Sequence, residues 1–146
     1  MSNEAGAQVQ MLLVEDNPDD RDLVLRALRK NNFSNSVDLA SDGQDAIDQL
    51  FGPGGFLSRS GSKVVLLDLK LPKVDGIEVL RQIRADSRGR LIPVVMLTSS
   101  QEESDLVASY ETGASSFIVK PVDFENFSRC VADIGMYWLL TNKSPS

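Results

Sequence analysis

Short apolar segments alternate along the chain with segments whose apolar residues recur every three to four positions. The short segments are rich in branched residues and have the length of ordinary strands. They cover residues 9–15, 37–40, 63–68, 92–98 and 116–120. The first, third and fourth contain uninterrupted apolar runs, which is typical of central strands buried on both faces of a sheet. The second and fifth are more mixed and suit its edges.

The segments between the strands carry apolar residues at helical spacing. They cover residues 23–28, 46–51, 77–83, 106–110 and 124–138. Residues that supply hydrogen-bond partners mark the helix ends. These are Asn17, Asp75 and Asp123 as N-caps of the first, third and fifth helices, Ser100 with Glu103 as a capping box, and Gly52 and Gly113 as helix ends. Strand and helix alternate five times, which predicts an α/β fold with a doubly wound, five-stranded parallel sheet flanked by five helices.

A single domain accounts for the chain of 146 residues. We place it at residues 9–141, between flexible tails at residues 1–8 and 142–146. Residues 52–62 interrupt the regular spacing with four glycines, three serines and a proline. We expect a flexible insertion loop there, because the residues before it are too few for an independent core. Asp42, Asp45 and Asp48 are expected to form a solvated helix face.

Composition narrows the possible functions. Acidic residues outnumber basic ones by 21 to 15, and no segment gathers lysine and arginine, which argues against DNA binding by this chain. A single cysteine, Cys130, excludes an internal disulfide, and neither a signal pattern nor a membrane-length apolar run is present. We therefore expect a cytoplasmic protein. Because the chain has no histidine, its chemistry must depend on carboxylates, hydroxyls and lysine.

Polar residues end four of the five predicted strands. Glu15 and Asp16 end the first strand, Asp68 the third, Thr98 the fourth and Lys120 the fifth. The carboxyl ends of parallel strands lie at one edge of a sheet, so these residues are expected to contribute to one site. Crowded carboxylates suit Mg²⁺ or Mn²⁺. A carboxylate beside such an ion can attack phosphorus, while Thr98 and Lys120 supply donors for the transferring oxygens.

Taken singly, these residues also have ordinary structural explanations. Asp16 precedes Asn17 and a proline, so it could simply belong to a solvated turn or helix cap. Thr98 and Lys120 are common strand-end residues, and Phe117 suits a core. Asp68 is harder to explain in this way, because it follows four apolar residues and precedes another leucine. The functional interpretation of the others therefore depends on Asp68.

Five motifs in order along the chain resemble the receiver domain of two-component response regulators, the CheY-like family, over about residues 9–135. They are Leu12-Leu13-Val14-Glu15-Asp16-Asn17, Leu66-Leu67-Asp68-Leu69-Lys70-Leu71-Pro72, Asp75-Gly76, Leu97-Thr98-Ser99 and Val119-Lys120-Pro121. Each motif alone is a weak pattern. Together, at the correct strand ends, they are specific.

The resemblance implies the sheet order 2-1-3-4-5 and a role for each site residue. Asp68 accepts a phosphoryl group from a sensor histidine kinase. Glu15, Asp16 and Asp68 hold Mg²⁺ or Mn²⁺, and the backbone carbonyl of Lys70 completes the protein ligands. The remaining roles are a switch pair, Thr98 and Phe117; phosphate binding by Lys120; and a cis bond before Pro121. The protein is then a phosphoacceptor with at most slow autophosphatase activity, and not an enzyme.

A narrower resemblance concerns residues 52–62 and the tail at residues 134–140, followed by Asn142 and Pro145. Both look like stand-alone response regulators that partner phytochrome-type light-sensing kinases. The tail around Trp138 is apolar on all sides, which is more than one helix face can bury. We expect a homodimer through the fourth helix, fifth strand, fifth helix and this tail. Packing of the tail within one chain and a kinase contact are the alternatives.

Other functions remain open at this point. An unphosphorylated docking module would more typically lose Lys120, Thr98 or an acidic ligand. A phosphorelay intermediate would pass its phosphate on to a histidine phosphotransfer protein. A phosphatase of the haloacid dehalogenase kind would carry Asp-x-Asp at the nucleophile, where this chain has Asp68-Leu69-Lys70.

Overall fold

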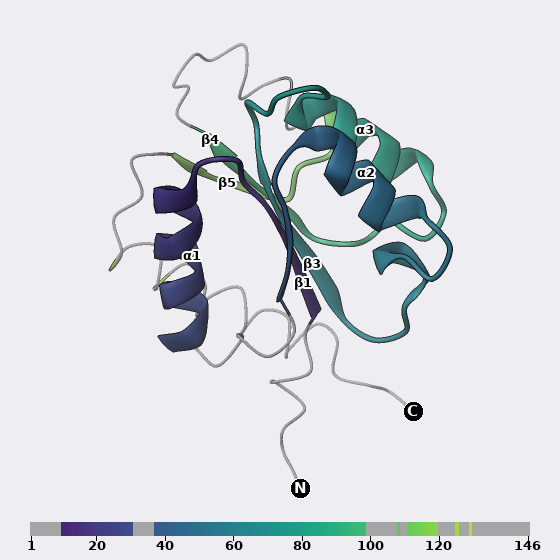
Figure 1. Cartoon of the computed structure of the whole chain (residues 1–146). Helices are drawn as coiled ribbons and strands as arrows, with labels where there is room; N and C mark the ends of the chain where they lie inside the picture. The colour runs from purple at the N-terminus through teal and green to yellow at the C-terminus, as the bar shows by residue number, and fades with distance from the viewer. Residues whose placement is uncertain are drawn as a thin grey trace, which may run out of the picture.

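The computed structural model describes residues 10–30, 37–98 and 111–119, together with the single positions 108, 125 and 129. Within these residues, strands alternate with helices along the chain (Figure 1). The elements are β1 (Gln10–Val14), α1 (Pro18–Lys30), β2 (Val37–Ala40), α2 (Gly43–Phe51), the 3-10 helix η3 (Phe56–Ser58), β3 (Lys63–Asp68), α3 (Gly76–Ala85), β4 (Val94–Thr98) and β5 (Ser116–Val119).

All five strands belong to one parallel sheet in the order β2-β1-β3-β4-β5. This confirms the predicted sheet order and the doubly wound α/β fold. β1 lies between β2 and β3, and its last residue, Val14, is in register with both Ala40 and Leu67. The strands with uninterrupted apolar runs, β1, β3 and β4, are central and almost entirely buried, and β2 and β5 are the edges, as their mixed composition indicated.

Side chains alternate between two cores, one on each face of the sheet, because successive residues of a strand point in opposite directions. Figure 1 shows α1 covering one face and α2 and α3 covering the other. On the α1 face, Leu13 and Leu66 pack with Val24 and Leu28 of the helix. On the other face, strand residues such as Leu67 pack against a larger group from α2, η3 and α3: Ala46, Leu50, Phe56, Leu57, Val79, Leu80 and Ile83.

Polar side chains fix the starts of the three described α-helices. The Oδ1 atom of Asn17 accepts hydrogen bonds from the backbone amides of Asp19 and Asp20 at 2.9 and 3.0 Å, and the Asp75 carboxylate accepts from the Glu78 amide. Both N-caps were predicted. Asp42 caps α2 by accepting from the Asp45 amide at 2.7 Å. It is therefore a helix cap, a role that the prediction of a solvated helix face did not include.

Residues 52–62 connect α2 to β3, but they differ from the flexible loop that their composition predicts. Their middle forms η3, in which Phe56 and Leu57 are buried in the core. Arg59 stacks over the Phe56 ring at 5.5 Å and forms an ion pair with Asp38 of β2 at 2.6 Å. The segment is therefore anchored at its centre, because two large apolar side chains among the glycines and serines are drawn into the core.

Several sequence predictions lie outside the described residues. These are most of the fourth and fifth helices, the chain ends at residues 1–8 and 142–146, Cys130, and the apolar tail to which we assigned a homodimer. Within the described part of the chain, the helices are too short or too polar to cross a membrane.

Candidate phosphoacceptor and metal site

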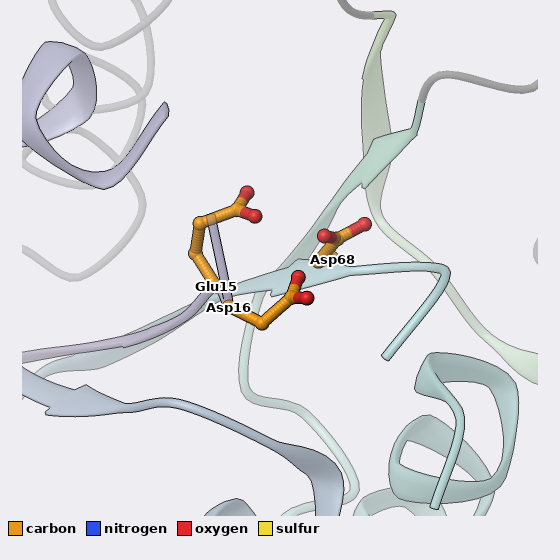
Figure 2. Close-up of side chains that lie close together, drawn as sticks. All are labelled: Glu15, Asp16 and Asp68. Atoms are coloured by element: carbon orange, nitrogen blue, oxygen red, sulfur yellow. The ribbon is translucent and has the colours of Figure 1, made fainter. Parts of the chain in front are cut away.

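Three acidic side chains meet at the carboxyl edge of the sheet. Glu15 and Asp16 follow β1, and Asp68 ends the neighbouring strand β3 (Figure 2). A carboxylate oxygen from each of the three lies within 4.8 Å of the others. Glu15 and Asp68 are buried and Asp16 is exposed, so the cluster opens to solvent on one side. The structure thus brings together the three acidic residues that the sequence assigned to one site.

The end of β1 places Glu15 through the backbone. The Glu15 amide donates to the Ala40 carbonyl of β2 at 3.0 Å, which extends the pairing of the two strands by one residue. Its Oε2 atom accepts a hydrogen bond from the Asn17 amide at 3.1 Å. Because Asn17 also caps α1, the strand end, the buried glutamate and the helix start form one hydrogen-bonded turn.

The end of β3 places Asp68 beside a tight turn. Its Oδ1 atom accepts a hydrogen bond from the Lys70 amide at 3.2 Å. Gly76, the first residue of α3, donates from its amide to the Leu69 carbonyl at 2.8 Å. A Cβ atom on Gly76 would lie inside van der Waals contact with the Asp68 carbonyl oxygen and 2.8 Å from the Leu69 Cα atom. Only glycine therefore allows the helix to start this close to Asp68.

Thr98 and Phe117, the expected switch pair, are diagonal neighbours on adjacent strands. Thr98 ends β4 and is fully buried. Phe117 of β5 is in register with Met96, two residues before Thr98, and both Phe117 and Met96 pack against the core beneath α2 and α3. Thr98 lies on the same face, because side chains two residues apart in a strand point the same way. Lys120 and Pro121, the other predicted site residues, lie outside the described part of the chain.

The start of α2 contacts the turn after Asp68, which was not predicted from the sequence. Asp42 forms an ion pair with Lys73, with 3.4 Å between Oδ2 and Nζ, and the Gly43 amide donates to the Pro72 carbonyl at 3.2 Å. The hydrogen bond from the Asp45 amide, followed by the contact with Lys73, holds the pKa of Asp42 below its usual value, despite some desolvation. An aspartate directly before a glycine, three residues before Asp45, is a recognisable N-cap pattern, but sequence alone does not reveal the neighbouring turn.

The acidic cluster suits a hard divalent cation. Each of the three residues offers a carboxylate oxygen, and such oxygen-only sets are typical of Mg²⁺ and Mn²⁺ sites. The carboxylates of Glu15 and Asp68 are buried, and a divalent cation beside them would add positive charge that favours their ionised forms. Glu15, Asp16 and Asp68 would hold the ion, with one side open for water or a ligand.

Comparison with known proteins gives a consistent result across the chain. A family model described as "Response regulator receiver domain" matches residues 11–132. A probable methanogenesis regulatory protein, FilR2 of Methanothrix harundinacea, is 45% identical over 136 residues, which cover 92% of this chain and 86% of the relative. The response regulator Rcp1 of Synechocystis is 34% identical over 146 residues, covering 100% of this chain and 99% of Rcp1.

Two solved structures are similar over most of the chain. The bacteriophytochrome response regulator RtBRR has 51% sequence identity and a TM-score of 0.72, covering 88% of this chain and 79% of RtBRR. The Mn²⁺-bound form of Rcp1 has 35% identity and a TM-score of 0.75, covering 94% of this chain and 99% of Rcp1.

Proposed function

The chain belongs to the response regulator receiver domain family, and on that premise we propose that it accepts a phosphoryl group on Asp68 in a Mg²⁺- or Mn²⁺-dependent reaction and signals through protein contacts. The observation that carries the proposal is the position of Asp68, buried at a strand end with carboxylate oxygens of Glu15 and Asp16 within 4.8 Å. The similarity to Rcp1, which has been solved with bound Mn²⁺, supports the choice of ion.

In the proposed reaction, a carboxylate oxygen of Asp68 attacks the phosphorus of a phosphohistidine or an acyl phosphate. A bond from Asp68 to phosphorus forms, and the bond from phosphorus to the donor breaks as the donor leaves with the electron pair. A bound divalent cation would supply positive charge next to the transferring oxygens. Thr98 would donate a hydrogen bond from its hydroxyl to one of these oxygens, and Lys120 would donate one from its ammonium to another. The turnover of an external substrate forms no part of this function.

Phosphorylation would act as a switch by changing the balance between two conformations. We assign the first movements to Thr98, which would approach the phosphoryl group, and to Phe117, the diagonal neighbour that packs on the same core. The readout would be a surface formed by the fourth helix, β5 and the fifth helix, through which we expect a homodimer.

A sensor histidine kinase is the proposed source of the phosphoryl group, and the cytoplasm the proposed location. The similarity to RtBRR favours a phytochrome-type kinase. The relative FilR2 is a probable methanogenesis regulatory protein, so the relatives differ in the process they serve. The proposed phosphorylation of Asp68 does not depend on which type of kinase supplies the phosphoryl group.

The proposal can be tested by intact-mass spectrometry after incubation with a small-molecule acyl phosphate, with and without Mg²⁺. We expect one phosphoryl adduct on the wild-type protein that requires Mg²⁺ and is absent from Asp68→Asn. Asp22→Asn, which changes an exposed aspartate of α1, is the matched control and should be modified like wild type. Light scattering on the same samples would show whether the adduct changes the oligomeric state.

Each other outcome would indicate a different function. Equal modification of Asp68→Asn would show that Asp68 is not the acceptor. No adduct on any variant would leave an unphosphorylated docking module. Sustained turnover of an added phosphoester would favour a phosphatase, and transfer of the phosphoryl group to an added histidine phosphotransfer protein would favour a phosphorelay intermediate.

A further inference from the structure

The turn at residues 69–75, which joins Asp68 to α3, has an unusual backbone. Lys73 has a φ of 71°, and among the residues that the structure describes it is the only non-glycine residue with a positive φ. Residues other than glycine, asparagine and aspartate are disfavoured at positive φ. The Val74 amide donates to the Pro72 carbonyl at 2.8 Å, which closes a tight bend around Lys73. Contacts from elsewhere are needed to keep such a conformation in place.

The start of α2 supplies these contacts to three successive residues of the turn, Pro72, Lys73 and Val74. The Gly43 amide donates to Pro72, and the Asp42 carboxylate pairs with Lys73. The third contact is with Val74, since a Cβ atom on Gly43 would lie 2.6 Å from the Val74 carbonyl carbon and 2.8 Å from its Cβ atom. The absence of a side chain at Gly43 is therefore what allows α2 to approach the turn.

The other end of the turn is fixed to the acidic cluster. The Leu69 amide donates to the Leu97 carbonyl of β4 at 2.8 Å, and the Lys70 amide donates to Oδ1 of Asp68. Between the fixed residues 69–70 and 72–74 only Leu71 intervenes. A displacement of Lys73 must therefore move Lys70, whose amide contacts the acceptor carboxylate and whose carbonyl the family resemblance makes a metal ligand.

We propose that Gly43 is a positioning residue for the metal site, because the start of α2, capped by Asp42, holds Pro72, Lys73 and Val74 in the conformation that presents Lys70 and Asp68 to Glu15 and Asp16. This inference rests on the proposed function, since it concerns the ion of the same site. Gly43 would touch neither the ion nor the phosphoryl group. Contacts that support metal ligands from outside typically change metal affinity by about 10- to 100-fold when they are lost.

Two substitutions at Lys73 separate positioning from charge. Asn and Val both remove the ammonium group, but asparagine tolerates a positive φ and valine does not. We expect Lys73→Val to raise the dissociation constant for Mg²⁺ about tenfold. Lys73→Asn should stay within about threefold of wild type, because an exposed ion pair contributes little. The measurement is titration calorimetry with Mg²⁺ alone, without a phosphodonor.

A second pair of substitutions tests Gly43 itself. Gly43→Ala should weaken Mg²⁺ binding at least about tenfold, because the added methyl group forces the turn away from α2. Gly54→Ala is the control, since Gly54 has a φ of 67° and open space around its Cα, so alanine there adds backbone strain far from the turn. It should lower stability and leave Mg²⁺ binding unchanged. If Gly43→Ala does not fold, the two Lys73 variants decide the question.

The possible failures are distinguishable. If wild type does not bind Mg²⁺, the proposed function loses its metal and the inference falls with it. If wild type binds Mg²⁺, and Gly43→Ala and Lys73→Val fold and bind Mg²⁺ as tightly as wild type, only the inference is wrong. An equal loss in Lys73→Asn and Lys73→Val, or in Gly54→Ala and Gly43→Ala, would likewise overturn it, because charge or general stability would then explain the effect.

Discussion

Gly76 and Asp68 are in contact through the backbone, with the first residue of α3 lying over the carbonyl oxygen of the proposed phosphoacceptor. The hydrogen bond from the Gly76 amide to Leu69 completes this contact at 2.8 Å. The start of α3 is therefore part of the structure that holds Asp68 at the end of β3, although Gly76 offers no side chain to the site.

Gly76→Ala should lower the free energy of unfolding by about 1–3 kcal/mol, the usual effect of overpacking a close contact. Relief of the clash requires α3 to move away from Asp68, so the rate of adduct formation should fall as well. Urea unfolding measures the first effect and intact-mass kinetics the second. An unchanged midpoint would show that the turn can absorb a methyl group without cost.

The hydroxyl of Thr98 should matter for phosphorylation more than for folding. Thr98→Val removes the donor proposed for a phosphoryl oxygen, and we expect adduct formation to slow about ten- to a hundredfold, as for the loss of one hydrogen bond to a charged group. Thr98→Ser keeps the hydroxyl and should stay within a few-fold of wild type. Equal rates for the two variants would exclude Thr98 as a donor to the reacting group.

The anchored state of residues 52–62 can be tested at Phe56, which is 1% exposed. Phe56→Ala should lower the free energy of unfolding by about 3–5 kcal/mol, as expected for the loss of a large buried aromatic side chain. Ser60→Ala changes an exposed residue of the same segment and should have little effect. A small effect at both positions would mean that the segment is as loosely held as its composition suggests.

A pH effect is expected where residues 52–62 meet the turn after α3. The side-chain hydrogen bond from Arg88 is the main reason that the pKa of Asp86 is lowered from 3.8 to about 2, and Arg88 also donates to Ser58 Oγ at 2.7 Å. Because the folded-state pKa is depressed, the stabilisation is fully present above 3.8 and is lost as the pH falls toward about 2.

The Asp86 carboxyl can be followed by NMR, with Arg88→Met as the matched variant. We expect the titration midpoint of Asp86 to lie near 2 in wild type and to return toward 3.8 in Arg88→Met. A normal midpoint in wild type would mean that the Arg88 contact does not persist in solution.

The strands and the polar residues at their ends could be predicted from the sequence because both depend on local patterns. Uninterrupted apolar runs identified the central strands, and a polar residue at each strand end marked one edge of the sheet. In the observed sheet, the pairing of β1 with β3 brings Asp68 to Glu15 and Asp16. The order of the strands itself came from the family resemblance, since several orders satisfy the same pattern.

Contacts between residues distant in sequence could not be predicted in this way. Arg84 looks like an ordinary basic residue in the last turn of a helix. In the structure its guanidinium donates to the carbonyls of Gly89, Ile92 and Gly113, and so connects α3 to the residues before β4 and β5. The clamp of Asp42 and Gly43 on the turn after Asp68 is another such contact. The prediction of a flexible loop at residues 52–62 was also wrong, because burial of Phe56 and Leu57 anchors the segment despite the glycines around them.

The place of β1 between β2 and β3 constrains the order in which the molecule can assemble during synthesis. β1 leaves the ribosome early with β2, but its other partner, β3, emerges only after α2 and η3. Until then the apolar side chains of Met11 to Val14 lack one neighbouring strand, a condition that favours chaperone binding or aggregation. The acidic cluster likewise stays incomplete until Asp68 has been synthesised and β3 has joined the sheet. Binding of a divalent ion by a growing chain would therefore indicate that β3 has paired with β1.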